Sequence, residues 1–153
     1  MWRVCAGLMA ALALAGTAAG APVAADVAAY LAAHPGGHPL GGTGIAYGGG
    51  VFVVTLRAPA QQNAVVDCPA GWFCFYDRPD YGYPRGKLSS CGWQSLAYWG
   101  WQDRVESAYY NIGKGGVQFW DGSTYLFAIS ADARARGDAS PYRNRATDVY
   151  RYC

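Results

Sequence analysis

Residues 68–91 read CPAGWFCFYDRPDYGYPRGKLSSC, and the rest of the chain is organised around this stretch. It contains three of the five cysteines. Cys68 and Cys74 are close enough in sequence to staple a single turn. The aromatic run Phe73–Tyr76 predicts a strand that leaves this turn, and Asp77–Asp80 predicts a polar turn after the strand. The stretch therefore predicts a small β-structured unit braced by cysteine.

The composition is typical of a small exported all-β protein. The 153 residues suffice for one ordinary domain. The formal net charge of +2 provides no strong field toward nucleic acid or an anionic membrane. Aromatic residues make up 15% of the chain and charged residues only 14%, with 21 glycines. This balance favours short strands and tight turns.

Residues 1–25 have the features of a secretory signal peptide. Arg3 gives a short basic start, Val4–Leu14 is apolar, and small residues follow. The apolar run is too short for a membrane span. Small residues favour cleavage after Gly20 or after Ala25. We therefore expect a secreted, extracellular protein without a membrane anchor.

The cysteines that remain after the signal peptide predict two disulfides, because an exported protein meets an oxidising environment. Three connectivities are open at this point. A zinc site is not favoured, because the only histidines lie far from the cysteines and no Cys-x-x-Cys pair is present. The four cysteines are Cys68, Cys74, Cys91 and Cys153.

The segment before residue 68 predicts a short helix and a hairpin. Asp26–Ala33 is rich in alanine, with Asp26 as a candidate N-cap and a Pro-Gly-Gly run just after it. Ile45–Tyr47 and Val51–Leu56 predict two strands that turn at three glycines. This part of the chain is therefore expected to be structured.

A polar linker over residues 58–67 is the best candidate for a domain boundary. It divides the expected mature chain into a leader segment, residues 26–67, and a main domain, residues 68–153. The chain after Cys91 continues as short strands separated by glycine-containing turns.

The main domain contains an internal echo. Phe75–Asp77 is followed by Asp103-Arg104 and a strand, and Phe119–Asp121 is followed by Asn144-Arg145 and a strand. Each half contains apolar strands that it cannot bury alone. Two such four-strand halves predict a Greek-key sandwich.

A set of residues in this domain carries the pattern of a known family. The pattern resembles the actinobacterial secreted proteins grouped with the streptomycete metalloproteinase inhibitor, over about residues 68–153. This resemblance implies an all-β, βγ-crystallin-like double Greek-key sandwich. It also implies a monomeric inhibitor of an extracellular peptidase, with a metallopeptidase as the expected target and no cofactor. The matching residues are Cys68, Pro69, Gly71, Cys74, Tyr76, Asp77, Tyr81, Gly82, Trp93, Gln94, Leu96, Trp99, Gly100, Trp101, Asp103, Arg104 and Ser107.

Two positions depart from the family pattern. A crystallin-type hairpin usually has glycine where this chain has Tyr83, so we expect Gly82 or Gly86 to take the left-handed backbone conformation instead. The best-known inhibitor of the group uses a loop braced by a local disulfide near the middle of the domain. No second closely spaced cysteine pair follows Cys91 before Cys153. That reactive loop therefore has no residue-by-residue counterpart here.

For this chain we predict the disulfides Cys68–Cys74 and Cys91–Cys153. The first would brace a rigid loop that enters a peptidase cleft, because a rigid loop loses little entropy on binding. The alternative is that this disulfide only stabilises the first hairpin of a small core. The candidate target-contact residues are Asp77, Arg78, Pro79, Asp80 and Tyr81.

The Greek-key resemblance also raises weak calcium binding, because crystallin-type sites use oxygen ligands from two loops. The candidate ligands are Asp103 and Ser107 in one loop and Asn144 and Thr147 in the other. Each loop departs from the calcium pattern at two of four places, with an arginine beside the ligand. The alternative is that these residues fix turns. The second functional hypothesis is thus a non-inhibitory structural, calcium-binding or cell-wall-associated module.

The remaining aromatic and polar residues bear on two further classes of function, ligand binding through tryptophan and catalysis. Trp93, Trp99 and Trp101, with Tyr98, suggest either a sugar-stacking or partner surface or core packing, and the spacing of Trp99 and Trp101 favours the core. Glu106 is the only glutamate, and no nucleophile motif or metal-binding helix is present. We therefore expect that the protein is not an enzyme.

Overall fold

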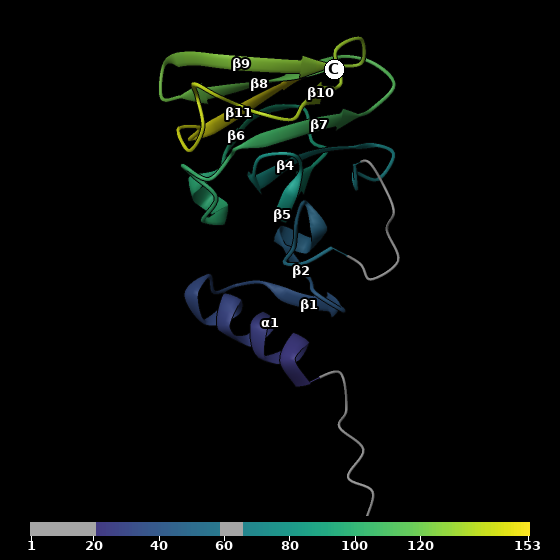
Figure 1. The fold of residues 1–153 in the computed structure, drawn as a ribbon, viewed down its shortest axis with the longest axis vertical. Helices are drawn as coiled ribbons and strands as arrows, with labels where there is room; N and C mark the ends of the chain where they lie inside the picture. Colours follow the sequence, from purple (N-terminus) through teal and green to yellow (C-terminus); the bar gives the residue numbers. More distant parts are fainter. Residues whose placement is uncertain (1–20, 59–65) are drawn as a thin grey trace, which may run out of the picture.

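The computed structural model describes residues 21–58 and 66–153 (Figure 1). The predicted signal peptide lies mostly outside these residues, as does most of the predicted linker. Among the residues described, no helix is long and apolar enough to cross a membrane. The elements are α1 (Ala21–Ala33), β1 (His38–Gly41), β2 (Gly44–Tyr47), η1 (Gly48–Gly50), β3 (Phe52–Thr55), β4 (Trp72–Arg78), β5 (Gly82–Leu88), β6 (Gly92–Ser95), η2 (Ala97–Trp99), β7 (Ser107–Asn111), β8 (Gly116–Asp121), β9 (Thr124–Ser130), β10 (Ala135–Arg136) and β11 (Asp148–Tyr152).

The strands form two antiparallel sheets that lie one above the other in Figure 1. The larger sheet has the order β1-β2-β3-β5-β4-β7-β10, and the smaller sheet has the order β6-β11-β8-β9. Two consecutive four-strand units, β4–β7 and β8–β11, each give their third strand to the other sheet. Strand β6 pairs with β11, and β10 pairs with β7. This exchange of strands makes a double Greek key, and the predicted all-β sandwich is confirmed.

The leader hairpin extends the larger sheet. Strands β2 and β3 pair as the sequence predicts, with Ile45 opposite Val54. Strand β1, which was not predicted, adds to the outer edge of β2. On its other side β3 pairs with β5, and Val54 lies opposite Gly86. Residues 38–55 thus share one sheet with the Greek key, while the division at residue 67 stays a prediction.

Helix α1 is longer than predicted, because the residues before Asp26 are mostly alanines, which favour helix. Asp26 lies inside the helix and forms an ion pair with Arg57, so its assignment as N-cap is wrong. The helix ends at Ala33, two residues before Pro35, as expected. Tyr30 anchors it to the sandwich, since its hydroxyl accepts a hydrogen bond from Nε1 of Trp101 at 2.9 Å.

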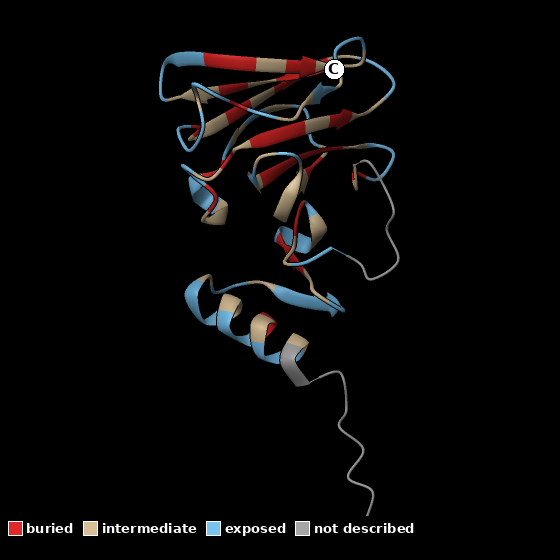
Figure 2. Ribbon diagram, viewed as in Figure 1, coloured by how far each residue is buried: buried red, intermediate tan, exposed pale blue. Residues whose placement is uncertain are grey.

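Buried residues lie on strands of both sheets (Figure 2), and many of them are aromatic. The ring centroid of Phe75 lies 6.0 Å from that of Phe52, 5.2 Å from that of Trp101 and 6.4 Å from that of Phe119. Gly86 lies against this cluster, and a Cβ there would overlap the Phe75 ring. The leader and both four-strand units therefore share one hydrophobic core.

Candidate functional site

Both predicted disulfides are present. Cys68 and Cys74 are buried and joined with a Cα–Cα distance of 5.7 Å, and Cys91 and Cys153 are joined with a Cα–Cα distance of 6.0 Å. The Cys68–Cys74 disulfide lies in a small second cluster with the buried Tyr76, apart from the core between the sheets. This cluster sits beneath the turn that connects β4 to β5.

The β4–β5 loop, residues 77–81, contains the candidate target-contact residues. Its backbone is attached to the body of the protein through Ser107, which is fully buried. The Ser107 hydroxyl donates to the carbonyl of Arg78 at 2.7 Å and accepts from the backbone N–H of Tyr81 at 3.0 Å. A third hydrogen bond runs from the N–H of Asp80 to the carbonyl of Gly137 at 2.7 Å. Tertiary contacts, and not only the local turn, hold this loop.

The backbone of the loop is left-handed at two residues that are not glycine. Asp80 has φ 52° and Tyr81 has φ 61°, a region that costs energy for L-residues. The hydrogen bonds to Gly137 and Ser107 offset this cost. The expectation that Gly82 or Gly86 takes the left-handed conformation is wrong, because the turn falls before Gly82 and Gly86 lies inside β5.

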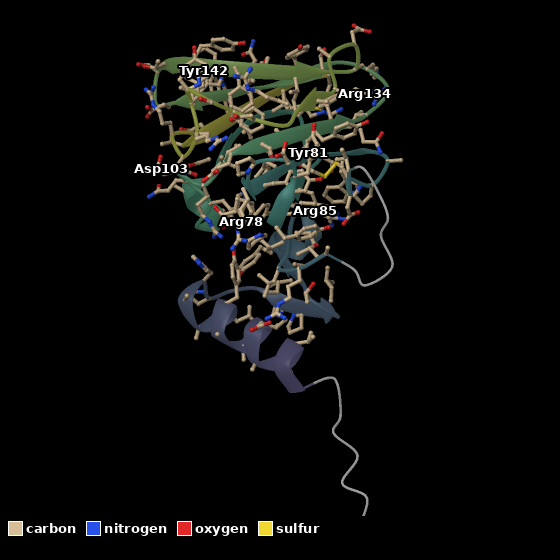
Figure 3. All side chains as sticks on the ribbon, viewed as in Figure 1. Arg78, Tyr81, Arg85, Asp103, Arg134 and Tyr142 are labelled. Carbon is tan, nitrogen blue, oxygen red and sulfur yellow. A yellow bond between two sulfur atoms is a disulfide. The ribbon has the colours of Figure 1, made fainter. Side chains whose placement is uncertain are left out.

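Side chains of the loop divide into fixed and free ones (Figure 3). The Tyr81 ring meets the rings of Tyr76 and Tyr109 edge-on, at centroid distances of 5.5 and 6.2 Å. Arg78 and Asp80 are exposed. The loop therefore presents one positive and one negative side chain on a fixed backbone.

An ion pair on the outer face of the larger sheet supports this region, and the sequence did not predict it. Asp67 pairs with Arg85, which is buried, and the Asp67 carbonyl accepts from the Tyr76 hydroxyl at 2.6 Å. Burial raises the pKa of Tyr76 well above its ordinary value. Burial and the hydrogen bond to Asp67 raise the pKa of Tyr83. Asp67 thereby ties the segment before Cys68 to strands β4 and β5.

Hydrogen bonds of matching kind hold the corresponding loops of the two units. The backbone N–H of Asp103 donates to Ala146 O at 2.9 Å, and that of Asn144 donates to Val105 O at 3.0 Å. In the turn between β8 and β9, the Thr147 hydroxyl accepts from the N–H of Gly122 at 2.8 Å. The internal echo seen in the sequence thus corresponds to two units with matching contacts.

Arginines accompany the aspartates at equivalent places in both units. Arg104 Nη2 lies 2.7 Å from Asp77 Oδ2, and Arg145 Nη2 lies 3.0 Å from Asp121 Oδ2. Neither aspartate is therefore free of a cationic neighbour. Arg104 and Arg145 are the arginines that directly follow the candidate calcium ligands Asp103 and Asn144 in the sequence.

The four calcium candidates take part in contacts that fix turns. Ser107 holds the β4–β5 loop, and Thr147 donates to Asp148 at 2.7 Å. Asn144 donates to Glu106 at 2.7 Å, and Asp103 is exposed with φ 57° (Figure 3). Within the described residues no group of three His, Cys, Asp or Glu side chains is placed to hold a metal ion. The contacts are those of the turn-fixing alternative, and calcium binding stays a prediction.

The tryptophans divide between core and surface. Trp101 is fully buried, and Trp99 packs against the core at the edge of helix η2. Trp93 is 60% exposed and Tyr98 is 78% exposed. The core interpretation is confirmed for Trp99 and Trp101, although these residues lie in and after a 3₁₀ helix and not on a strand.

The exchange of strands and the two disulfides define a small, disulfide-braced double Greek-key protein. The sequence model of peptidase inhibitor family I36 matches residues 61–129, which include the β4–β5 loop and the first unit. The resemblance to the family of the streptomycete metalloproteinase inhibitor is therefore confirmed over this part of the chain. The match indicates a non-enzymatic inhibitor of peptidases. No curated protein and no solved structure matches the chain.

Proposed function

We propose that the chain is a secreted, monomeric inhibitor of an extracellular metallopeptidase, and that it binds its target through the β4–β5 loop. The match to an inhibitor family supports the inhibitory role. The candidate signal peptide supports export. The observation that carries the choice of loop is the set of three hydrogen bonds from Ser107 and Gly137 that fix its backbone while Arg78 and Asp80 stay exposed.

A loop fixed in this way suits an inhibitor, because the free protein already has the conformation needed for binding. The left-handed backbone at Asp80 and Tyr81 differs from the extended strand that peptidase clefts accept as substrate. The loop thus blocks the cleft through its charged side chains and resists cleavage at these two residues. The Cys68–Cys74 disulfide also supports the loop, because it packs with Tyr76, whose ring contacts that of Tyr81.

The test is an inhibition titration of the purified, oxidised protein against a thermolysin-type metallopeptidase and a trypsin-type serine peptidase. We expect inhibition of the metallopeptidase at micromolar concentration or below. The double variant Arg78→Ala, Asp80→Ala is expected to weaken inhibition roughly 10- to 100-fold, since charged contact residues often carry 1–3 kcal/mol. The melting temperature is expected to change little, because both side chains are exposed.

The matched control is Ser123→Ala in the equivalent turn of the second unit, where Ser123 is also exposed. It is expected to leave inhibition unchanged. Inhibition that survives the double variant would place the contact elsewhere. Absence of inhibition of both peptidases at micromolar concentration would favour the non-inhibitory structural alternative.

A further inference from the structure

The outer face of the smaller sheet carries a row of touching aromatic rings, one from each of its four strands. The ring centroid of Trp93 on β6 lies 5.1 Å from that of Tyr150 on β11 and 5.5 Å from that of Trp120 on β8. Trp120 lies 5.5 Å from Tyr125 on β9. These four residues, here named the aromatic face, run across the sheet from one edge strand to the other.

The aromatic face is open at both ends. Trp93 is 60% exposed and Tyr125 is 50% exposed, while Trp120 and Tyr150 are half-buried between them. Large exposed aromatic side chains that adjoin one another are uncommon on a protein without a partner for that surface. On the first unit the outer aromatic residues Tyr76, Tyr81 and Tyr109 pack with the Cys68–Cys74 disulfide, and none of them is exposed.

Polar side chains alternate with the rings. In the strand register, Asp148 stands between Ser95 and Trp120, and Gln118 stands beside Tyr150. Val117 and Phe119 on either side of Gln118 are buried, so the amide points outward. The surface therefore offers hydrogen-bonding groups beside Trp120 and Tyr150 and is not a purely apolar patch.

The charge of this face is almost zero. Strands β6, β8 and β9 contain no lysine or arginine, and the single arginine of β11, Arg151, is buried. The carboxylate of Asp148 accepts a hydrogen bond from Thr147. Phosphate-bearing ligands need cationic partners, so nucleic acid and anionic lipid do not fit here.

We propose that the aromatic face binds a neutral polysaccharide, in the form of an extended chain of pyranose units that lies across the four strands. A pyranose ring has an apolar C–H face, which stacks on an aromatic ring, and equatorial hydroxyls, which need donors and acceptors at its edge. The alternation of rings with Ser95, Gln118 and Asp148 provides both, and the low charge matches an uncharged ligand. Because this face lies on the smaller sheet and the β4–β5 loop on the larger, the protein can hold a glycan and a peptidase together.

The experiment uses the full, oxidised protein and four probes: chitin and cellulose beads for retention, and chitohexaose and cellohexaose for titration by tryptophan fluorescence. We expect retention on at least one polysaccharide and saturable fluorescence with the matching hexaose. Trp93→Ala and Tyr125→Ala are each expected to weaken binding roughly tenfold, as for the loss of one stacked ring. Both side chains are largely exposed, so the melting temperature serves as a check that the fold is retained.

Two further variants separate glycan binding from apolar association. Gln118→Leu is expected to weaken glycan binding, whereas an apolar protein or a second copy of this chain would bind it more strongly. Tyr98→Ala removes the most exposed aromatic ring away from this sheet and is expected to change nothing. The proposal is overturned if the unmodified protein is not retained on any probe, if Trp93→Ala binds as well as the unmodified protein, or if sedimentation shows that this face joins two copies. None of these outcomes depends on whether the protein inhibits a peptidase.

Discussion

The two Greek-key units share their internal contacts and differ in what covers them. In both, a buried or half-buried hydroxyl pins the first turn: Ser107 in the β4–β7 unit and Thr147 in the β8–β11 unit. In both, an arginine pairs with the aspartate that ends the aromatic motif, Asp77 in the first and Asp121 in the second. These repeated contacts explain how one sequence pattern folds twice.

The outer surfaces of the two units differ in their covering. The first unit is covered by the Cys68–Cys74 disulfide and the Asp67–Arg85 pair, whereas the second leaves its outer aromatic residues open. Contacts that occur in both units stabilise the fold, whereas features that occur in one unit are candidates for function. The exposed charged residues Arg78 and Asp80 of the β4–β5 loop belong to the first unit, and the open aromatic face belongs to the second. We therefore assign them the two proposed functions.

The largest expected effect comes from the two disulfides, since Cys68–Cys74 lies at the first strand of the first unit whereas Cys91–Cys153 joins the first unit to the end of the second. Replacing Cys91 and Cys153 with serine opens a closure of sequence separation 62 and is expected to cost about 4 kcal/mol of unfolding free energy. Replacing Cys68 and Cys74 with alanine opens a separation of only 6 and is expected to cost about 2–3 kcal/mol. Urea denaturation of the two double variants measures both values.

The two disulfide variants are expected to rank differently in inhibition: the variant that loses less stability is expected to lose more inhibition. Loss of Cys68–Cys74 loosens the cluster beneath the β4–β5 loop, while Cys91–Cys153 lies at the chain end, away from that loop. The inhibition constant, measured under conditions where each variant is folded, should therefore rise more for the Cys68, Cys74 variant. Equal inhibition by both variants would mean that this disulfide does not support the loop.

The next effect compares the two hydroxyls that pin the turns. Ser107→Ala removes two hydrogen bonds from a fully buried position and leaves the Tyr81 N–H without its partner, at an expected cost of about 2–3 kcal/mol. Thr147→Val makes the matching change at a half-buried position, where water can replace the lost partner, and is expected to cost about 1 kcal/mol. Thermal or urea unfolding of the two variants measures the difference in unfolding free energy. Equal losses would show that the two hydroxyls stabilise their turns equally.

The last effect is a dependence of stability on alkaline pH that arises from Tyr76 in the first unit. Tyr76 and Trp120 occupy equivalent places, since the carbonyl of each accepts a backbone hydrogen bond from the residue just before the last strand of its unit. Burial raises the pKa of Tyr76 above its ordinary value of 10.0. Below pH 10 this contribution to stability is fully present, and above pH 10 only the unfolded chain ionises, so stability falls by about 1.4 kcal/mol per pH unit. Tryptophan has no such ionisation.

This pH dependence is measured by urea unfolding at pH 9, 10 and 11. Tyr76→Phe is expected to reduce the slope by the contribution of one group, at the cost of the hydrogen bond to Asp67. The other buried tyrosines of the leader and first unit contribute equally to the slope in both proteins. An unchanged slope in the variant would show that Tyr76 ionises equally in the folded and unfolded chains.

Local features were predictable where neighbouring residues decide them. The Phe73–Tyr76 run and the leader hairpin are strands, and the closely spaced cysteines are joined, because these depend on side-chain alternation and short chain reach. Strands β1 and β10 were missed, since their short sequences carry little pattern and they exist only by pairing with β2 and β7. The N-cap at Asp26 was wrong because the alanines before it extend the helix.

The candidate site was predicted in part. The β4–β5 loop is where the sequence placed it, but the residues that fix it, Ser107 and Gly137, are distant in sequence. Ser107 was predicted as a calcium ligand or, alternatively, as a residue that fixes a turn, and its hydrogen bonds to Arg78 and Tyr81 are of the second kind. A signal for its actual role was present in the internal echo, which places a hydroxyl residue shortly after Asp-Arg or Asn-Arg in both halves. Asp67 carried no signal, since its partner Arg85 is defined by the sheet.

The sequence by itself determined the class of fold, the two disulfides and the repetition of one aromatic-Asp motif, because periodicity and cysteine spacing are properties of the chain. Only the tertiary structure decided which copy of that motif is covered and which is open. The exchange of β6 and β10 between sheets brings Trp93 beside Tyr150 and Trp120, although these residues are far apart in the chain. Such a surface depends on strand pairing across the whole domain, and no local pattern encodes it.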